Sequence, residues 1–297
     1  MKIFMTGATG YVGTQVAKEL IKNNYQVYGL TRSDKSAQKL TDLGGIPVMG
    51  TLEDLETLKK SAQDADAILH LGFTNDFDHF DKATKMDQDA IETMGEAIKE
   101  TNKPLIVTAG TAGLDPGVVL TENGLGFPGY DDVSPRQSEQ TARRLAKEGV
   151  NSATVRFAPS VHGDGRYGLI SMMAQMAQKN GVVTYFGNGE NRWNAVNYLD
   201  AAHLFVLALE YRLKNTGDMR VFNAVGEGQV KMIDIVNTIS KKLELPTKSL
   251  PQPKAGASFD VTQTFGADYP ASSVLTQNEL NWKPDHIGLL DDLKENL

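Results

Sequence analysis

The chain has 297 residues, 40% of them apolar and 23% charged, and its formal net charge is −7 at pH 7. This length is enough for one large domain or two modest ones, and the acidic balance provides no basic stripe for a nucleic-acid partner. The sequence has no cysteine, which excludes disulfides, thiolate nucleophiles and cysteine-ligated metals.

The histidines are scattered, and none shows the spacing of a metal-binding motif. They are His70, His79, His162, His203 and His286. We therefore expect no metal site. The first apolar run begins at Lys2, and no run approaches the ~20 residues of a membrane span. These features predict a cytoplasmic protein with no membrane partner.

The first motif is MTGATGYVGTQVAKEL, residues 5–20, which holds three glycines at a spacing of three. A short apolar run precedes it and a helical pattern follows over Gly13–Lys22, so the layout is strand, tight turn, helix. Gly7 makes the turn, Gly10 lets a pyrophosphate approach the backbone, and Gly13 lets helix and strand pack closely. The helix N-terminus also favours an anion. The motif predicts a dinucleotide site, although glycine-rich turns also occur for purely structural reasons.

Apolar runs alternate with amphipathic stretches through the first half of the chain. The predicted strands are Ile3–Thr6, Gln26–Leu30, Ile46–Met49, Ala67–Leu71, Leu105–Thr108 and Ala153–Phe157. The predicted helices are Gly13–Lys22, Ser36–Leu43, Leu55–Ala62, Lys82–Glu100 and Pro135–Glu148. This alternation predicts an α/β fold with a Rossmann-type, doubly wound parallel sheet, whose ligand lies beyond the carboxyl ends of the strands.

After Pro159 the alternation loosens. The segments HGDGRYG and YFGNGENRWN are expected to be loops around a helix over Leu169–Lys179. AVNYLDAAHLFVLALEYRL is expected to be a further helix, RVFNAVG a strand that rejoins the sheet, and Ile233–Leu243 a helix. We predict a dinucleotide-binding domain of residues 1–158, to which 196–225 return, and a smaller discontinuous α/β lobe of residues 159–195 and 226–297 that binds substrate.

Five segments in order carry a family resemblance: TGATGYVG, AILHLGF, RFAPSVHGDG, WNAVNYLDAAHLFVLALE and LNWKP. With them the chain resembles the short-chain dehydrogenase/reductase superfamily in its extended, epimerase/dehydratase-like form over nearly its whole length. The resemblance implies a nicotinamide dinucleotide cofactor and a small-molecule substrate. It also implies that the cofactor contacts Gly7, Thr9, Gly10, Tyr11, Val12, Gly13, Leu52, Leu71, Gly72, Phe73, Thr108, Pro159 and Val161.

The end of the second strand normally selects the cofactor, because an acid there binds the ribose hydroxyls and a cation accepts a 2′-phosphate. Here the segment reads VYGLTRSDKS, with Arg32 at that place. A guanidinium pairs well with phosphate, which favours NADP(H) over NAD(H). The alternative is an ordinary solvated strand-end cation. The acid that often follows the third strand is absent from Gly50-Thr51-Leu52, so the adenosine contact there is expected from Thr51 or the backbone.

The resemblance also implies a catalytic tyrosine with a lysine four residues later, since a phenol needs a nearby cation to act as a base at neutral pH. The matching stretch is DDVSPRQSEQTARRLAKEG, in which Pro135 replaces the tyrosine and Glu139 the lysine. A carboxylate would raise a phenol's pKa. Tyr130 lies five residues before Pro135, and the residue four places after Tyr130 is Ser134 and not a lysine. Tyr130 therefore does not restore the pair.

Other side chains remain for catalysis. Thr111 follows the fifth strand and can anchor a substrate oxygen, and His162 can act as acid or base without a lysine. Asp87 aligns with the family's helix asparagine. The alternatives are a structural strand-end threonine, a histidine that caps its own turn, and a helix-capping or surface acid. Trp193 and Asn197 are predicted to face substrate.

These features predict an NADP(H)-dependent oxidoreductase or epimerase-like enzyme for a small carbonyl or hydroxyl compound. The alternative is a non-catalytic NADP(H)-binding redox sensor, which the missing pair favours. A sugar-nucleotide epimerase proper would require NAD(H) and an intact pair. Charged residues on the two helices that form a dimer interface in many relatives predict a monomer or weak dimer; they are Glu96, Lys99, Arg143, Arg144 and Lys147.

Overall fold

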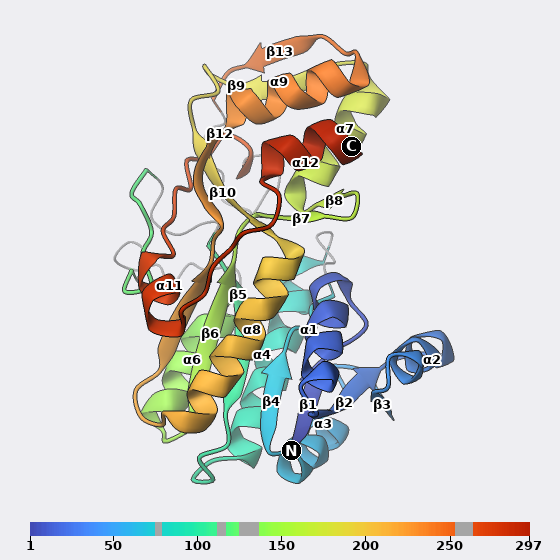
Figure 1. Ribbon diagram of the computed structural model, residues 1–297, viewed down its shortest axis with the longest axis vertical. Helices are drawn as coiled ribbons and strands as arrows, with labels where there is room; N and C mark the ends of the chain where they lie inside the picture. Colours follow the sequence, from blue (N-terminus) through green and yellow to red (C-terminus); the bar gives the residue numbers. More distant parts are fainter. Residues whose placement is uncertain (75–78, 112–116, 125–136, 253–263) are drawn as a thin grey trace. The chain divides into compact units, whose positions relative to one another are not determined.

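The computed structural model describes residues 1–74, 79–111, 117–124, 137–252 and 264–297 (Figure 1). The chain forms two compact units. Unit 1 comprises Met1–Ala109, Val133–Val155 and Ala202–Phe222, and unit 2 comprises Gly110–Asp132, Arg156–Ala201 and Asn223–Leu297. Residues 117–124 thus pack with unit 2, whereas the sequence assigned them to the dinucleotide-binding domain. Which ligand each part holds stays a prediction.

A seven-stranded sheet has the order β11-β6-β5-β4-β1-β2-β3. Its strands are β1 (Lys2–Thr6), β2 (Gln26–Thr31), β3 (Ile46–Met49), β4 (Ala67–His70), β5 (Leu105–Gly110), β6 (Ser152–Phe157) and β11 (Arg220–Ala224). Pairing is parallel between β1 and both β2 and β4, between β2 and β3, and between β4 and β5. The order reverses direction between β1 and β4, which confirms the predicted doubly wound, Rossmann-type sheet.

Helices of unit 1 cover this sheet. They are α1 (Tyr11–Lys22), α2 (Asp34–Asp42), α3 (Leu55–Asp64), α4 (Phe80–Ala97) and α6 (Ser138–Lys147), together with most of α8 (Tyr198–Lys214). In Figure 1, α1 and α8 lie in front of the sheet and α4 and α6 behind it. Each predicted helix of this region is confirmed within a few residues, except that the predicted start at Pro135 lies outside the described residues.

Periodicity explains these elements. Val12, Val16 and Leu20 of α1 follow one helical face and are buried, while all four residues of β4 are buried, as a central parallel strand requires. Gly95 of α4 lets α6 approach, because a Cβ there would lie 2.5 Å from Leu145 Cδ1. The resulting core of unit 1 holds the sheet's carboxyl edge in a fixed arrangement.

Unit 2 has a four-stranded sheet, β12-β10-β7-β8, and a two-stranded sheet, β13-β9. The strands are β7 (Ser160–Gly163), β8 (Arg166–Tyr167), β9 (Val183–Phe186), β10 (Arg192–Asn197), β12 (Glu227–Lys231) and β13 (Thr247–Leu250). The helices are α7 (Leu169–Asn180), α9 (Met232–Leu243), α11 (Val274–Leu280) and α12 (Leu289–Asn296). Its core includes Met173, Trp193 and Ile235.

One prediction in this region is wrong. HGDGRYG and YFGNGENRWN are not loops throughout, because they supply β8 and parts of β7, β9 and β10. The helix expected from Ala195 is confirmed within a few residues; it begins at Tyr198, and the three residues before it end β10. These strands have two to six residues, too few for a period-two pattern to stand out between glycines. Among the described residues, no helix combines the length and apolarity needed to cross a bilayer.

Candidate functional site

The glycine turn joins β1 to α1 at the carboxyl edge of the sheet. Gly7 has φ +72°, and a Cβ there would lie 2.8 Å from the Gly72 nitrogen. A Cβ at Gly13 would lie 2.0 Å from the Gly7 carbonyl oxygen. Gly10 is exposed, and its Cβ would meet only that same oxygen, at 3.1 Å. The first and third glycines are thus required by packing, and Gly10 leaves an accessible backbone surface.

The N-terminus of α1 is suited to an anion. Gly10 is its N-cap and provides no side-chain cap, and the first turn carries no acidic residue. The Thr14 hydroxyl and amide both donate to the Gly10 carbonyl oxygen, at 2.6 and 3.0 Å. The first N–H groups of the helix therefore have no partner within it and lie at the positive end of its dipole. Tyr11 is half-buried and Val12 buried here.

Two cations come from β2 and α2. Arg32 is exposed directly after β2, and it makes no ion pair or hydrogen bond in the part of the chain that the structure describes. The next residue, Ser33, caps α2 by accepting a hydrogen bond from the Ser36 amide at 3.3 Å. Lys39 of α2 donates from Nζ to the Thr9 carbonyl oxygen at 2.9 Å, which places an ammonium group beside the glycine turn. Lys39 was not predicted as a site residue, because no sequence pattern links it to a turn thirty residues earlier.

The segments after β3, β4 and β5 adjoin this edge. The Leu71 amide donates to the Thr6 carbonyl oxygen at 3.3 Å, and the Gly72 amide to the Thr6 hydroxyl at 3.0 Å. Phe73 packs edge-on against Phe80, with 6.1 Å between ring centroids. The buried Thr108 donates from its hydroxyl to the His70 carbonyl oxygen at 3.3 Å. The turn after β4 is thereby fixed against the glycine turn.

The loop after β3 is held by its own side chains. Asp54 accepts from the Thr51 amide at 2.6 Å and from the Thr51 hydroxyl at 3.1 Å. Leu52 is half-buried against the core of unit 1. Both donors of Thr51 are therefore engaged within the loop, so the adenosine contact expected there falls to the backbone or to other residues.

Asp87 belongs to a buried hydrogen-bonded chain. It is 1% exposed, accepts from the Ser138 hydroxyl at 2.5 Å, and pairs with His70 Nε2 at 3.1 Å. His70 Nδ1 lies 2.9 Å from the Thr6 hydroxyl, which accepts from the Gly72 amide. Since Asp87 accepts from Nε2–H, Nδ1 is left to accept from Thr6. The surface and cap alternatives for Asp87 are wrong. No local pattern pointed to Ser138 as its partner.

The predicted catalytic residues of unit 2 are also buried. Thr111 donates to Asn194 Oδ1 at 2.9 Å and to the Phe157 carbonyl oxygen at 3.2 Å. His162 is 1% exposed, and its Nδ1 lies 2.8 Å from Asp292 Oδ2. The alternative that His162 caps its own turn is wrong, because its partner comes from α12, 130 residues away. Asp292 was not predicted as a partner of His162, because no local pattern links residues so far apart in the sequence.

The His162–Asp292 pair leaves one ring atom available. Asp292 also accepts from Asn296 Nδ2 at 2.9 Å, so both its oxygens are engaged. Within the described ranges, His162 Nε2 makes no hydrogen bond. An imidazole oriented by a carboxylate at Nδ1 with Nε2 unengaged is suited to proton transfer.

Two tyrosines interact with Asp292, the partner of His162. Burial, with Asp292 as a second cause, raises the pKa of Tyr167 to about 12, and its hydroxyl donates to the Asp292 carbonyl oxygen at 3.4 Å. Burial also raises the pKa of Tyr198, with smaller contributions from Asp164 and Asp292. Both phenols stay protonated at neutral pH, so neither is a base. Glu139, predicted to stand at the lysine position, pairs with Arg143 at 2.7 Å, whereas Pro135, Tyr130 and Ser134 lie outside the described residues.

The remaining predicted ligands shape unit 2. Trp193 is fully buried, stacks on Phe265 at 5.7 Å between centroids, and presents no surface to a substrate here. Asn197 is 5% exposed and accepts from the Leu199 amide at 3.0 Å as α8 begins. The Pro159 carbonyl oxygen accepts from Leu169 at 3.2 Å, and Val161 pairs with Val196 between β7 and β10. Ligand roles for these four residues stay predictions.

One trio of potential metal ligands occurs among the described residues: Asp200, Asp285 and His286. The Asp200 carboxylate accepts from His286 Nδ1 at 2.7 Å and from the His286 amide at 3.2 Å. Its main-chain oxygen accepts from Trp282 Nε1 at 3.1 Å. These contacts give the trio a structural task, which is to hold the LNWKP segment against the start of α8.

Comparisons with known proteins identify the family of this chain. The model of the family described as NAD dependent epimerase/dehydratase matches residues 3–224. An uncharacterized protein of Schizosaccharomyces pombe, C2A9.02, is 40% identical over 99% of this chain and 98% of its own length. Another uncharacterized protein, YLL056C of Saccharomyces cerevisiae, is 38% identical over 100% of this chain and 99% of its own length.

Solved structures share the fold. DesIV, a dTDP-glucose 4,6-dehydratase from Streptomyces venezuelae with NAD bound, has a TM-score of 0.77 at 16% identity over 100% of this chain and 95% of its own. The UDP-glucose 4-epimerase of Thermotoga maritima, with UDP-glucose, has a TM-score of 0.75 at 18% identity over 100% and 97%. The chain therefore belongs to the NAD-dependent epimerase/dehydratase family, within the extended short-chain dehydrogenase/reductase superfamily.

Proposed function

We propose that the protein binds NADP(H) at the glycine turn and acts as an oxidoreductase or epimerase-like enzyme on a small carbonyl or hydroxyl compound. The observation that carries the proposal is the accessible N-terminus of α1 with two cations beside it, Arg32 and Lys39. Family membership favours a nicotinamide dinucleotide. The relatives with solved structures bind NAD, so the choice of NADP(H) rests on this chain's own cations.

The charge pattern supports the extra phosphate. Arg32 has no carboxylate partner among the described residues, and its guanidinium can bind a phosphate with two parallel hydrogen bonds. Lys39 already reaches the Thr9 carbonyl oxygen, so its ammonium group lies where the ribose of a dinucleotide on α1 would extend. NAD(H) shares the pyrophosphate but lacks the 2′-phosphate that would pair with Arg32.

The proposed reaction divides the work between cofactor and chain. When bound, the nicotinamide carries the redox step, and the chain supplies position and proton transfer. We assign the proton to His162 Nε2, because Asp292 orients the ring and both nearby tyrosines stay protonated. We assign Thr111 as the hydroxyl that anchors a substrate oxygen. Its donor is engaged by Asn194, so it would have to turn or accept a hydrogen bond instead.

We further propose a cytoplasmic monomer or weak dimer without nucleic-acid or membrane partners. Ion pairs within the chain support the monomer, since they neutralise the outer faces of α4 and α6. Arg144 pairs with Glu92 at 2.6 Å and with Glu148 at 3.0 Å, and Lys99 pairs with Glu148 at 3.3 Å. Faces with such networks are poorly suited to an apolar dimer interface.

The cofactor proposal is tested by titrating the protein with NADPH and NADH and following nicotinamide fluorescence. We expect NADPH to bind about 10- to 100-fold tighter, because charged hydrogen bonds to the 2′-phosphate are lost with NADH. Arg32→Ala and Lys39→Ala should remove most of this preference. Lys22→Ala, at the far end of α1, removes the same charge and should leave it unchanged. Equal affinities for the two cofactors would refute the choice of NADP(H).

The second candidate is a non-catalytic NADP(H) sensor, favoured by Glu139, whose pairing with Arg143 leaves no cation at the lysine position. Oxidation of NADPH should be screened against aldehydes, ketones and quinones. Turnover of any compound supports the enzyme. Tight NADPH binding with an inert panel supports the sensor.

A further inference from the structure

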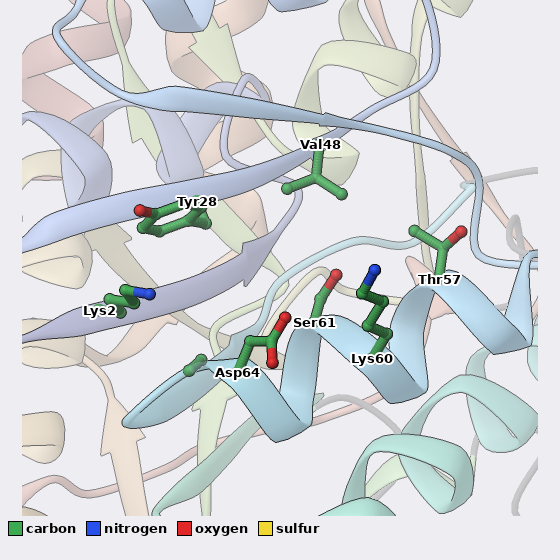
Figure 2. Close-up of a pocket in the computed structure, with 8 residues that line it drawn as sticks. Lys2, Tyr28, Val48, Thr57, Lys60, Ser61 and Asp64 are labelled. Atoms are coloured by element: carbon green, nitrogen blue, oxygen red, sulfur yellow. The ribbon is translucent and has the colours of Figure 1, made fainter.

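Unit 1 contains a pocket of about 390 Å³ between α3 and the strands β1, β2 and β3 (Figure 2). Lys2, which begins β1, and Asp64, which ends α3, both line it. The lining extends from these residues along α3 to Thr57 and Val48, and it includes no residue of the glycine turn, which follows the carboxyl end of β1. Its volume falls within the roughly 300–1,000 Å³ of small-molecule sites. The pocket is thus separate from the cofactor turn and large enough for a ligand.

The pocket is bordered by a polar, partly exposed face of α3. The face of this helix that packs on the sheet is apolar, and its Leu58 and Ala62 are fully buried. The four α3 residues that line the pocket follow the neighbouring face with the spacing i, i+3, i+4 and i+7; they are Thr57, Lys60, Ser61 and Asp64. Thr57 and Ser61 are half-buried, and Lys60 and Asp64 are exposed, so the charged groups lie at the rim of the pocket.

These side chains are unengaged within the described ranges. Lys60 and Asp64 have the i, i+4 spacing at which opposite charges pair, yet they form no ion pair. The hydroxyl of Ser61, between them, makes no hydrogen bond. Figure 2 shows the Lys60 ammonium group directed toward the strands and the Asp64 carboxylate beside Ser61. One wall therefore presents a cation and an anion held apart.

The opposite wall is mostly apolar. Tyr28 of β2 and Val48 of β3 are half-buried and face the helix in Figure 2. Lys2 Nζ lies 5.7 Å from the centroid of the Tyr28 ring and adds a second cation. An aromatic ring and a branched aliphatic side chain form a surface on which a planar ring can lie.

We propose that this pocket binds a planar aromatic molecule carrying both a carboxylate and an ammonium group, the chemistry of a free aromatic amino acid. The ring lies against Tyr28 and Val48. The carboxylate accepts from Lys60 and Lys2, and the ammonium group donates to Asp64 and Ser61. The inference does not rest on the proposed function, because the site has its own walls and its own ligand.

The test compares L-tryptophan with indole-3-propionate, which lacks the ammonium group, and tryptamine, which lacks the carboxylate. The full chain with labelled methyl groups is titrated, and the Val48 and Thr57 methyl signals report binding. We expect saturable binding of tryptophan, about tenfold tighter than either analogue. In Lys60→Gln, the affinity for tryptophan should fall to that of the unaltered chain for tryptamine. In Asp64→Asn, it should fall to that of the unaltered chain for indole-3-propionate.

Lys59→Gln is the matched control, since Lys59 is an exposed neighbour on α3 outside the pocket. It should bind tryptophan as the unaltered chain does, and the circular dichroism and methyl-signal dispersion of every sample verify that each variant is folded. Three outcomes would overturn the proposal: no saturable shift with tryptophan, equal affinity for all three compounds, or equal loss in Lys59→Gln and Lys60→Gln.

Discussion

Each unit of the molecule contains a buried histidine–aspartate pair, and the two pairs differ in what remains free. In unit 1, His70 contacts Asp87 through Nε2 and Thr6 through Nδ1, so both ring nitrogens are engaged. In unit 2, His162 contacts Asp292 through Nδ1 alone. Burial and a carboxylate partner therefore do not identify a catalytic histidine. The second ring nitrogen, engaged in His70 and unengaged in His162 among the described residues, distinguishes the two pairs, so we propose the first as a structural connector and the second as a candidate for proton transfer.

The connector is tested most strongly by Asp87→Ala. The change leaves His70 and Ser138 without their acceptor in the core, so we expect the free energy of unfolding to fall by about 3–5 kcal/mol. Urea denaturation measures this. Asp89→Ala removes a carboxylate of the same helix that pairs with Lys85 near the surface, and should change stability by less than about 1 kcal/mol. A similar loss in both variants would show that Asp87 is no special connector.

The proton-transfer assignment predicts that His162→Gln lowers kcat about 10²-fold while NADPH affinity is kept. Steady-state kinetics on whichever substrate the screen finds will measure this. His70→Gln is the matched control, since it alters an equally buried histidine with no unengaged nitrogen. Its stability should fall, but kcat per folded molecule should stay within about twofold. If the two variants lose kcat equally, the contrast between the pairs fails.

A smaller effect is expected for Ser138→Ala. The Asp87 carboxylate loses one of its two described donors and keeps His70, so the free energy of unfolding should fall by about 1.5 kcal/mol. Ser138→Thr retains the hydroxyl and should recover part of the loss. Thermal unfolding of the three proteins gives the comparison, and an unchanged midpoint for Ser138→Ala would contradict the proposed chain.

The smallest effect concerns alkaline pH. Because burial beside Asp292 raises the pKa of Tyr167 above its ordinary value of 10.0 to about 12, the folded state holds this proton more tightly than the unfolded state. Its stabilising contribution is complete below pH 10 and is lost as the pH rises from about 10 to 12. Tyr167→Phe removes the titrating group, so its stability should decline less over that interval. Parallel alkaline declines in denaturation experiments would exclude this role.

Much of the fold follows from local pattern. The glycine spacing of the first turn, the largely apolar run of β4 and the amphipathic pattern of α1 are all visible over short distances in the sequence, so the Rossmann-type sheet was predictable. The strands of unit 2 were not, because β8 and its neighbours are short and lie between glycines. The partner of β8 is the adjacent β7, but other strands of unit 2 pair at a distance in the sequence, as Ala195 of β10 does with Glu227 of β12.

The residues of the candidate site also fall into two groups, those that a local pattern predicts and those that only the fold brings together. The sequence by itself determined the glycine turn and the cation at Arg32, and it predicted that Glu139 stands at the position of the family's lysine, because each depends on residue type at a fixed local spacing. Only the tertiary structure decided that Lys39 reaches Thr9, that Asp87 is buried between Ser138 and His70, and that Asp292 holds His162. These contacts join residues 17 to 130 positions apart, and short-range periodicity carries no information about pairs at that separation.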